Sequence, residues 1–456
     1  MSALILISVL GVIVLYLGLF GNRKLLVPVA VIGLLAALYF LQTGWNLNHP
    51  MFETMVRFDR FSVLFTSGLI IITMLIFLFG VDYYERMTEH VAEHYTLMLF
   101  SLVGAMLITS YNNLLVLFLG IEILSIPLYV LAGGKRHSMR SGEAAFKYFL
   151  LGSFSSGFFL MGIALLYGST GSFDIATIQA FATSNLAPSN MLFLLGLFFT
   201  AIGLAFKIAA APFHFWSPDV YEGAPTLITA FMATVVKMGA FAAFYRFLEI
   251  TALPPSMTKA LLVMTFATLL IGNIVALRQT QFKRLMAYSS IAHSGFLLMA
   301  LLSHQPNTAN VLFYYTFTYA LGTVGLFIIF TLVKRAANGD ENIRIFRGLF
   351  RSHPWLAILA MVFLLSLAGI PLTAGFIAKY QVFLLAISAG FIKLTLFAVL
   401  MAVVGIYYYV LVIRETFTPS DYEQGTTLVV TPLNWLVISL CGVAVVAFGV
   451  MPWLLA

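Results

Sequence analysis

Apolar segments of roughly 20 residues recur along the whole chain, separated by short polar connections or by clusters of Pro and Gly. A helix of that length crosses the ~30 Å hydrocarbon core of a bilayer. Only 9% of the 456 residues are charged, against about 25% in soluble domains, so lipid rather than water must solvate most of the side chains. The pattern predicts an all-α polytopic membrane protein.

The apolar segments predict about 14 transmembrane helices. They fall near residues 3–20, 25–42, 61–81, 96–110, 113–132, 144–167, 191–214, 226–247, 259–277, 285–303, 310–334, 355–386, 392–414 and 431–453. The first segment lacks the basic start and small-residue exit of a cleaved signal peptide, so we expect it to be a membrane helix. We expect no soluble domain in addition to the helices.

Basic residues are distributed unevenly between the connections. Five lie in connections after even-numbered helices: Arg57, Arg60, Arg246, Lys259 and Lys393. Fifteen lie in connections after odd-numbered helices: Arg23, Lys24, Arg86, Lys135, Arg136, Arg140, Arg278, Lys283, Arg284, Lys334, Arg335, Arg344, Arg347, Arg351 and Arg414. Because cytoplasmic loops retain Lys and Arg, we expect the odd connections in the cytoplasm and both termini on the non-cytoplasmic side of a bacterial inner membrane.

The sequence excludes several kinds of chemistry within this chain. Cys441 is the only cysteine, so neither a thiolate-held iron–sulfur cluster nor a disulfide can form internally. No dinucleotide-binding G-x-G-x-x-G or phosphate-binding G-x-x-x-x-G-K-[ST] motif is present. The net charge of +7 is expected to reflect cytoplasmic loops and not a nucleic-acid surface. Electron transfer or nucleotide hydrolysis must therefore occur in a partner.

Charged side chains nevertheless occur inside the predicted spans. They are Glu122, Lys147, Lys207, Lys237 and Lys379. A lysine near the bilayer centre costs about 2.5–3.5 kcal/mol, so such residues are usually functional. We interpret them as protonatable groups whose pKa values depend on burial and on one another. Two simpler alternatives are that Lys147 snorkels from a helix end and that Glu122 is a structural partner of one buried lysine.

Two of these lysines lie beside a proline in the middle of a span. Pro212 has no N–H to offer the carbonyl of Ile208, so we expect the helix to break beside Lys207, leave backbone groups unpaired and admit water. Pro371 precedes Lys379 by eight residues in the same arrangement. The broken spans are helices 7 and 12, and a five-helix unit that repeats must invert, because five is odd.

We therefore predict two inverted five-helix repeats, helices 4–8 and 9–13. Secondary transporters built in this way place their ion sites at discontinuous helices near the midplane. The expected domains are an N-terminal three-helix segment (1–95), the first repeat (96–247), the second repeat (259–414) and a C-terminal helix (431–456).

Two histidines extend the candidate site. His214 lies seven residues after Lys207 and would share its face if the helix continued, so we expect it in the pocket at the break. His293 lies deeper in its span, where it can join a hydrogen-bonded file with neighbouring hydroxyls: Ser289, Ser290 and Ser294.

Five segments resemble a known family. They are GIEILSIPLYVLAG, AAFKYFLLGSFSSGFFLMGIALLYGSTGS, FKIAAAPFHFWSPDVYEGAPT, AYSSIAHSGFLL and GIPLTAGFIAKY. Together they closely resemble the N subunit of respiratory complex I, the proton-translocating NADH:quinone oxidoreductase. Its L and M subunits and multisubunit cation/proton antiporters share the P-F-H-x-W segment. SPDVYEGAPT and YSSIAHSG look like the N branch, and Lys379 argues against the M branch, where a glutamate is expected.

The resemblance implies a proton relay made of Glu122, Lys147, Lys207, His214, Lys237, His293 and Lys379. In its input half Glu122 would pair with Lys207, and Lys147 would modulate that pair. Two unit charges about 4 Å apart interact by roughly 4 kcal/mol at an effective dielectric of about 20. Moving one charge against 100 mV costs about 2.3 kcal/mol. Rearranging one such pair is therefore of the right size to drive one proton.

The resemblance also implies that Lys237 lies on a central hydrophilic axis near His214 and His293, and that Lys379 is the carrier in the output half. Quinone, NADH, FMN and iron–sulfur clusters are expected in partner subunits and no cofactor in this chain. The expected partners are the other membrane subunits of complex I, including homologous antiporter-like subunits, together with the lipid bilayer and protons, and no nucleic acid.

Two alternatives remain open from the sequence. The same helices and lysines would suit a subunit of a multisubunit cation/proton antiporter without a redox partner. A structural membrane subunit could use the buried charges only to hold its helices in register. Loss of pumping with normal assembly after substitution of Lys207 would exclude the structural alternative.

Overall fold

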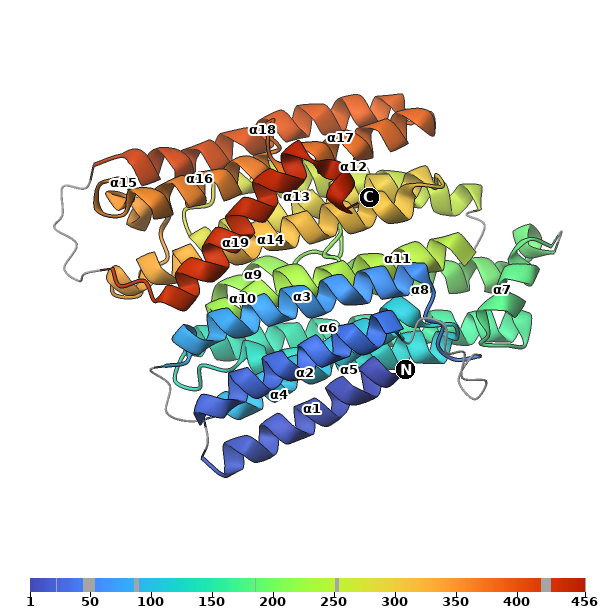
Figure 1. Cartoon of the computed structure of the whole chain (residues 1–456). Coiled ribbons are helices and arrows are strands. Elements are labelled where there is room, and N and C mark those ends of the chain that lie inside the picture. The colour runs from blue at the N-terminus through green and yellow to red at the C-terminus, as the bar shows by residue number, and fades with distance from the viewer. Residues whose placement is uncertain are drawn as a thin grey trace.

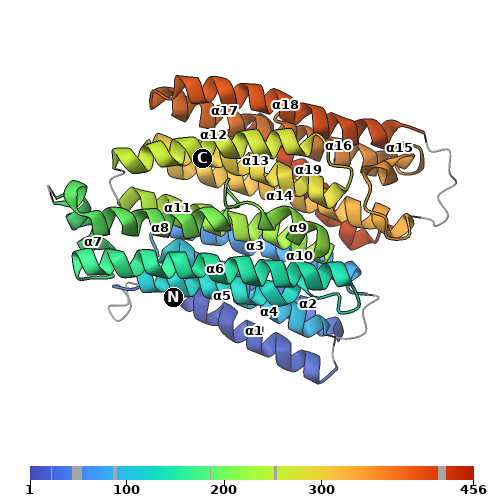
Figure 2. The same ribbon diagram turned by 180° about the vertical axis from the view of Figure 1, so that it is seen from behind.

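Helices form most of the chain that the computed structural model describes, which comprises residues 1–21, 23–43, 54–85, 90–184, 186–250, 254–419 and 428–455. Figures 1 and 2 show long helices lying side by side, with the chain passing back and forth between the two ends of the bundle. Arg86, one of the basic residues assigned to the cytoplasmic side, lies outside the described residues.

Twelve stretches of the described residues are long and apolar enough to cross a membrane, which confirms the polytopic all-α fold. They are α1 (Ser2–Leu19), α2 (Arg23–Thr43), α3 (Arg60–Tyr83), α4 (Val91–Ser110), α5 (Leu114–Ala132), α6 (Met139–Thr170), the continuous stretch of α10 (Thr226–Phe231), the π-helical η3 (Met232–Val236) and α11 (Lys237–Ile250), then α12 (Pro255–Ala276), α13 (Phe282–Ser303), α14 (Thr308–Ala336), α18 (Ile392–Phe417) and α19 (Pro432–Val450).

The two interrupted spans are present where proline predicted them. The first is divided into α8 (Met191–Lys207) and α9 (Trp216–Gly223), and the second into α16 (Pro354–Ala368) and α17 (Ala374–Ser388). The 17 residues of α8 are at the lower limit for crossing a bilayer, and α9, α16 and α17 are too short to cross one alone. The total of about 14 spans and the inverted repeat stay predictions.

Shorter elements were not expected from the sequence. They are α7 (Ile175–Ala182), η2 (Ala187–Ser189), η4 (Ile343–Phe346), α15 (Leu349–Ser352) and η5 (Pro452–Leu455). In addition, α6 begins at Met139 instead of residue 144, because the Ser138 side chain accepts a hydrogen bond from the Ser141 N–H and caps the helix. Lys147 therefore lies in the third turn of α6 and not at its end.

Burial differs strongly between the helices. The most apolar parts of α14 and of the α10–α11 stretch are buried on all sides, whereas most residues of α1 and α2 are exposed or only partly buried. The helices approach closely where glycines face each other: a Cβ on Gly104 of α4 would lie 2.2 Å from the backbone nitrogen of Leu124 on α5. The centre of the bundle is thus formed by α10–α11, α13 and α14.

Both termini lie toward the end of the bundle at which α7 lies, in both views (Figures 1 and 2). An even number of crossings produces this arrangement. Which end faces the cytoplasm stays a prediction based on the basic residues.

Candidate functional site

Lys207 is the last residue of α8 and lies directly before the break in the span. Its side chain is buried, and its Nζ has no hydrogen-bond partner among the described residues. The Nζ lies 5.5 Å from the ring centroid of Tyr148 and 5.8 Å from that of Tyr129. The faces of these two rings attract the ammonium by cation–π interactions. Because no hydrogen bond fixes this group, a change in its protonation state breaks none.

The backbone at the break is paired by neighbouring helices. The Oγ of Ser294 on α13 donates to the carbonyl of Ile208 at 2.6 Å, and the N–H of Ala211 donates to the Oγ1 of Thr268 on α12 at 2.9 Å. The expectation that the break leaves these groups unpaired is wrong, because hydroxyls of α12 and α13 replace the bonds that the helix loses.

Two crevices flank the break, with volumes of about 160 and 480 Å³. Pro212 and Phe213 line both of them, and their other walls are mostly aromatic or aliphatic. The space beside Pro212 is therefore apolar, and neither Lys207 nor His214 is among the described residues that line it.

Glu122 and Lys207 are not in contact in this structure. The half-buried Glu122 carboxylate accepts a hydrogen bond from the Oγ of Ser156 at 2.5 Å, while the Lys207 Nζ has no partner. The pair that the resemblance implied is thus not formed here, because a hydroxyl on α6 satisfies the carboxylate and aromatic rings surround the lysine.

Lys147 forms ion pairs away from Glu122. Its Nζ lies 2.7 Å from the Oδ2 of Asp219 on α9 and 2.7 Å from the Oε1 of Glu143, one turn earlier on α6. The Oδ1 of Asp219 lies 2.9 Å from the Nη1 of Arg284 on α13. Lys147 is 39% exposed and does not simply snorkel, because a carboxylate on another helix binds it.

A second group of ion pairs continues this network at the same end of the bundle. The Lys283 Nζ lies 3.1 Å from the Oε1 of Glu341 and donates to the carbonyls of Glu222 and Ala224, and Lys334 also pairs with Glu341. Burial raises the pKa of the Glu341 carboxyl, but Lys283 and Lys334 outweigh it and hold this pKa below its ordinary value.

Sequence reasoning missed this network. Asp219 and Glu222, whose carboxylates pair with Arg284, stand in the segment SPDVYEGAPT, which we assigned to a family but not to ion pairs. Asp219 and Arg284 are 65 residues apart, so nothing in local spacing indicates that they meet. One signal in the sequence could have indicated this network. Charged residues are concentrated directly after the apolar segment 191–214 and directly before the segment 285–303.

Lys237 begins α11, directly after the π-helical η3. Its buried Nζ donates to the carbonyl of Ser290 and to the Ser290 Oγ at 2.5 Å, and it lies 5.6 Å from the ring centroid of Tyr319. π-helical turns occur frequently at functional sites. This turn has neither proline nor glycine, so the sequence did not predict it.

His293 is held by two phenols. Its Nδ1 lies 2.7 Å from the hydroxyl of Tyr315 and its Nε2 3.1 Å from the hydroxyl of Tyr409, which in turn bonds the Ser289 hydroxyl. Its ring also lies 4.7 Å from that of Tyr319. A neutral imidazole donates through one nitrogen and accepts through the other, so it can pass a proton along such a file.

Lys379 on α17 is bound by the end of α16. Its Nζ donates to the carbonyls of Leu367 at 3.0 Å and Ala368 at 2.8 Å, and it lies 5.1 Å from the ring centroid of Phe296. The C-terminal carbonyls of a helix attract a cation, so the break in this span provides the site for the lysine.

His214 is buried, its Nδ1 has no hydrogen-bond partner in the described part of the chain, and its ring lies 4.4 Å from that of Phe215. None of its contacts in the described part of the chain joins it to Lys207 or Lys237. The structure therefore does not bring His214 into direct contact with the other relay candidates.

One helix connects the remaining candidates. On α13, Ser294 bonds the carbonyl next to Lys207, and the Ser290 carbonyl accepts from both Ser294 and Lys237. Also on α13, the ring of His293 contacts the ring of Tyr319, and the Lys237 Nζ contacts this same tyrosine ring. Phe296, in the next turn, separates His293 from Lys379. This arrangement of ammonium, hydroxyl and imidazole groups can accept and transfer protons inside the bundle.

Known proteins share this fold and sequence. The family model described as NADH:quinone oxidoreductase/Mrp antiporter, TM, matches residues 111–405. NADH-quinone oxidoreductase subunit N of Cytophaga hutchinsonii is 39% identical, and the alignment covers 99% of this chain and 98% of that protein. The same subunit of Flavobacterium psychrophilum is 37% identical with the same coverage.

Solved structures agree. A chain of respiratory complex I from Thermus thermophilus has a TM-score of 0.83 and 33% identity, with 99% of this chain and 98% of that chain covered. A chain of the Mrp complex from Dietzia sp. has a TM-score of 0.85, covers 100% of this chain and 95% of its own length, and is 20% identical, which shows the shared fold alone.

Proposed function

The chain belongs to the NADH-quinone oxidoreductase subunit N family, and we propose that its buried lysines and His293 form a proton relay. It is a multi-pass, proton-translocating membrane subunit of a multisubunit respiratory complex with other antiporter-like subunits. The relay runs from Lys207 through Lys237 and His293 to Lys379, in the order in which α13 connects them.

The observation that carries this proposal is the state of the Lys207 ammonium. It is buried, lacks a hydrogen-bond partner, and lies one residue from a carbonyl that Ser294 bonds. A buried ion-pair partner that only held helices together would be expected to have its charge paired. An unpaired lysine that is linked through α13 to the next lysine suits transfer better than structural support.

We further propose that Glu122 is the switch for Lys207. In this structure the Ser156 hydroxyl donates a hydrogen bond to the Glu122 carboxylate. In a second state the carboxylate pairs with the Lys207 ammonium instead. At about 4 Å and an effective dielectric of about 20, that pair is worth roughly 4 kcal/mol, more than the ~2.3 kcal/mol needed to move a charge against 100 mV. Forming it holds the proton, and breaking it releases the proton toward Lys237.

Lys147 and His214 take secondary roles in this proposal. Lys147 acts through Asp219, because this ion pair ties α6, which carries Ser156, to α9 beyond the break. His214 lies at the break itself, where a change in the position of α9 would bring its ring toward or away from Lys207.

Other assignments are also part of the proposal. We place the quinone, NADH, FMN and iron–sulfur clusters in partner subunits, which the single cysteine of this chain supports. The excess of basic residues supports odd connections in the cytoplasm and both termini outside it in a bacterial inner membrane. Residues 96–247 and 259–414 would be the inverted repeats, between the segments 1–95 and 431–456.

The test is Lys207→Met in the intact complex. Methionine fills the same volume and leaves no polar group unsatisfied, so we expect normal assembly on a native gel. Quinone-dependent proton pumping in membranes is expected to be lost together with coupled turnover. The matched control is Lys393→Met, which removes an exposed lysine from α18 and should pump normally. Unchanged pumping in Lys207→Met would contradict the relay.

A further inference from the structure

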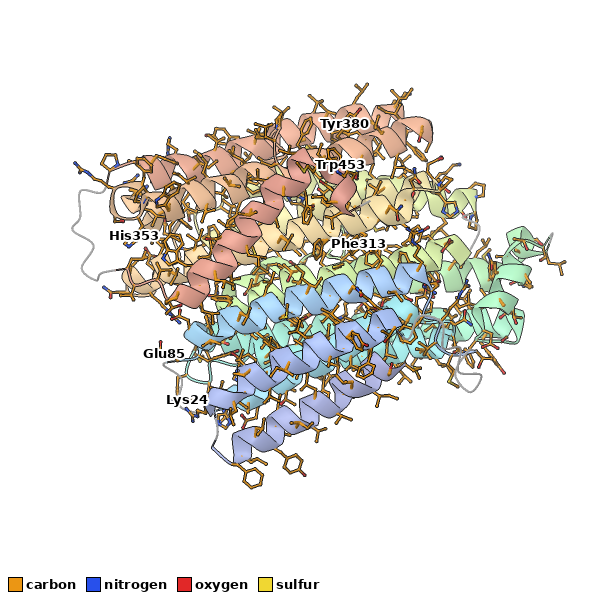
Figure 3. The ribbon with its side chains drawn as sticks, in the orientation of Figure 1. Lys24, Glu85, Phe313, His353, Tyr380 and Trp453 are labelled. Carbon is orange, nitrogen blue, oxygen red and sulfur yellow. The ribbon has the colours of Figure 1, made fainter. Side chains whose placement is uncertain are left out.

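A buried glycine of α14 lies beside open space inside the bundle. Gly322 belongs to the helix whose Phe313 is labelled in Figure 3. A Cβ added to Gly322 would meet no heavy atom within 4 Å apart from its chain neighbours and its own helix backbone. The other described glycines with as much room, such as Gly142 and Gly168, are exposed at the surface. The structure therefore contains a small internal void next to α14.

Two hydroxyls without hydrogen bonds lie on the same stretch of this helix. Tyr319 is 5% exposed and Thr323 is fully buried, and neither the Tyr319 hydroxyl nor the Thr323 Oγ1 has a partner among the described residues. Gly322 lies three residues after Tyr319, so the two are neighbours on the helix surface. Buried hydroxyls are normally satisfied. A void bordered by polar groups holds water, whereas a void with only apolar walls stays dry.

These hydroxyls lie close to Lys237. The hydroxyls of Ser290 and Thr323 lie beside that of Tyr319 without forming a hydrogen bond to it. The same Ser290 hydroxyl accepts a hydrogen bond from the Lys237 ammonium. The void, the two unpaired hydroxyls and the lysine are therefore parts of one buried polar region.

The relay lacks a proton path between Lys237 and His293. The Lys237 Nζ lies 5.6 Å from the ring centroid of Tyr319, and the His293 ring lies 4.7 Å from that ring. The face of an aromatic ring cannot carry a proton. The hydrogen bonds of Lys237 go to Ser290, and those of His293 go to two phenols, so no hydrogen bond between described residues joins the lysine directly to the histidine.

We propose that the void binds water, held by the hydroxyls of Tyr319 and Thr323, and that this water passes the proton from Lys237 toward His293. The inference rests on the proposed relay and adds to it a carrier and two residues that position the carrier. Water suits the site because it donates and accepts hydrogen bonds at once, so it can satisfy both hydroxyls and still contact the ammonium.

The transfer balances in protons and charge. The N–H bond of the Lys237 ammonium breaks as an O–H bond forms on the water, and a second proton of the water moves to the Tyr315 hydroxyl. The proton of that phenol passes to the His293 Nδ1, which lies 2.7 Å away. Tyr315 lies seven residues before Gly322 and therefore on the same face of α14. The positive charge moves from lysine to imidazole, and no group is oxidised or reduced.

The first test is Gly322→Ala in the intact complex. The added methyl group enters the void, and alanine favours a helix more than glycine does, so the thermal midpoint should stay equal or rise. Proton pumping is nevertheless expected to fall at least about ten-fold, because the methyl group displaces the water. The control Gly168→Ala makes the same change on the exposed face of α6 and should pump normally. Equal pumping by the two variants would overturn the proposal.

A second pair of variants tests the hydroxyl itself. Thr323→Val removes the Oγ1 and keeps the shape of the side chain, and we expect reduced pumping with a thermal midpoint that is unchanged or lower. Thr331→Val is the control on the same helix, because the Thr331 Oγ1 donates to the carbonyl of Phe327. Removing a buried hydroxyl that binds nothing should raise the midpoint. A higher midpoint of Thr323→Val would therefore show that no water is bound and would refute the site.

A cryo-EM map of the intact complex that resolves ordered waters separates this inference from the relay. We expect water density at Tyr319 and Thr323 in the parent and none in Gly322→Ala. If the parent has no such density while Lys207→Met loses pumping, the water site is wrong and the relay stands. If the density is present but Lys207→Met pumps normally, the relay is wrong, and with it the role of this water in proton transfer.

Discussion

The Oγ of Ser294 lies 2.6 Å from the carbonyl oxygen of Ile208 and donates to it. Pro212 has no N–H to give this carbonyl, so a side chain 86 residues away supplies the missing donor. The same Oγ lies 3.2 Å from the Ser290 carbonyl, to which Lys237 also donates. The hydroxyl that repairs the broken helix thus connects it with the next lysine.

Ser294→Ala is expected to destabilise the break. The Ile208 carbonyl would be buried without a donor, which costs about 1–3 kcal/mol. The control is Ser303→Ala in the same helix, because the Ser303 Oγ donates to the Met299 carbonyl of its own helix and the loss of this bond should have a much smaller effect. Thermal unfolding of the intact complex measures both. Equal midpoints for the two variants would refute the role assigned to Ser294.

The sequence predicted the features that depend on local chemistry. Apolar length predicted the membrane helices, and Pro212 and Pro371 predicted the two breaks. Charge inside apolar segments identified Lys207, Lys237 and Lys379, all of which are buried. These predictions succeed because burial of charge and loss of a backbone N–H have consequences that do not depend on the rest of the fold.

The sequence failed where distant residues meet. The partner of Glu122 is Ser156 and not Lys207, and Asp219 joins Arg284 across 65 residues of sequence. The π-helical η3 depends on how its neighbours pack, since none of its residues is a helix breaker. Such contacts are set by the packing of helices, and the spacing of residues along one helix contains no information about it.

Asp219→Asn tests whether the ion pair of Lys147 contributes to function. The variant removes the pairs of Asp219 with Lys147 and Arg284, and all three side chains are about one-third exposed, so the loss of stability should stay below about 2 kcal/mol. Pumping should nevertheless fall, because α6 and α9 lose the charge that ties them together. Glu143→Gln is the control, since Glu143 pairs with Lys147 at the same 2.7 Å but lies on α6 itself. Equal pumping by both variants would argue against a role for the link between the helices.

Glu341→Gln should change both stability and its pH dependence. The variant leaves the buried Lys283 without its carboxylate, which costs about 3 kcal/mol at neutral pH. The folded-state pKa of Glu341 lies below its ordinary value of 4.5, so its stabilisation is complete above that value and is lost as the pH falls through the lower folded pKa.

Thermal midpoints between about pH 3 and 7 check this expectation, because the loss occurs below the ordinary pKa of 4.5. The difference between the parent complex and Glu341→Gln should be constant near neutrality and shrink toward the acidic end. Asp340→Asn changes the neighbouring exposed carboxylate and should follow the parent. A difference that grows on acidification would have the wrong sign and would exclude the ion pairs as its cause.

Gly369→Ala should disturb Lys379 without altering its charge. Gly369 caps α16 with φ +83°, and an added Cβ would lie 2.7 Å from the Lys379 Cδ. The left-handed backbone alone costs an L-residue about 1–2 kcal/mol.

Gly390 provides the control, because its φ is +85° and nothing lies within 4 Å of a Cβ there. Gly390→Ala therefore introduces the same backbone strain without the contact. Both variants should lower the thermal midpoint of the complex, but only Gly369→Ala should reduce proton pumping per electron, since it alone moves the Lys379 ammonium away from the carbonyls of Leu367 and Ala368. Equal pumping by the two variants would show that the position of Lys379 does not limit proton transfer.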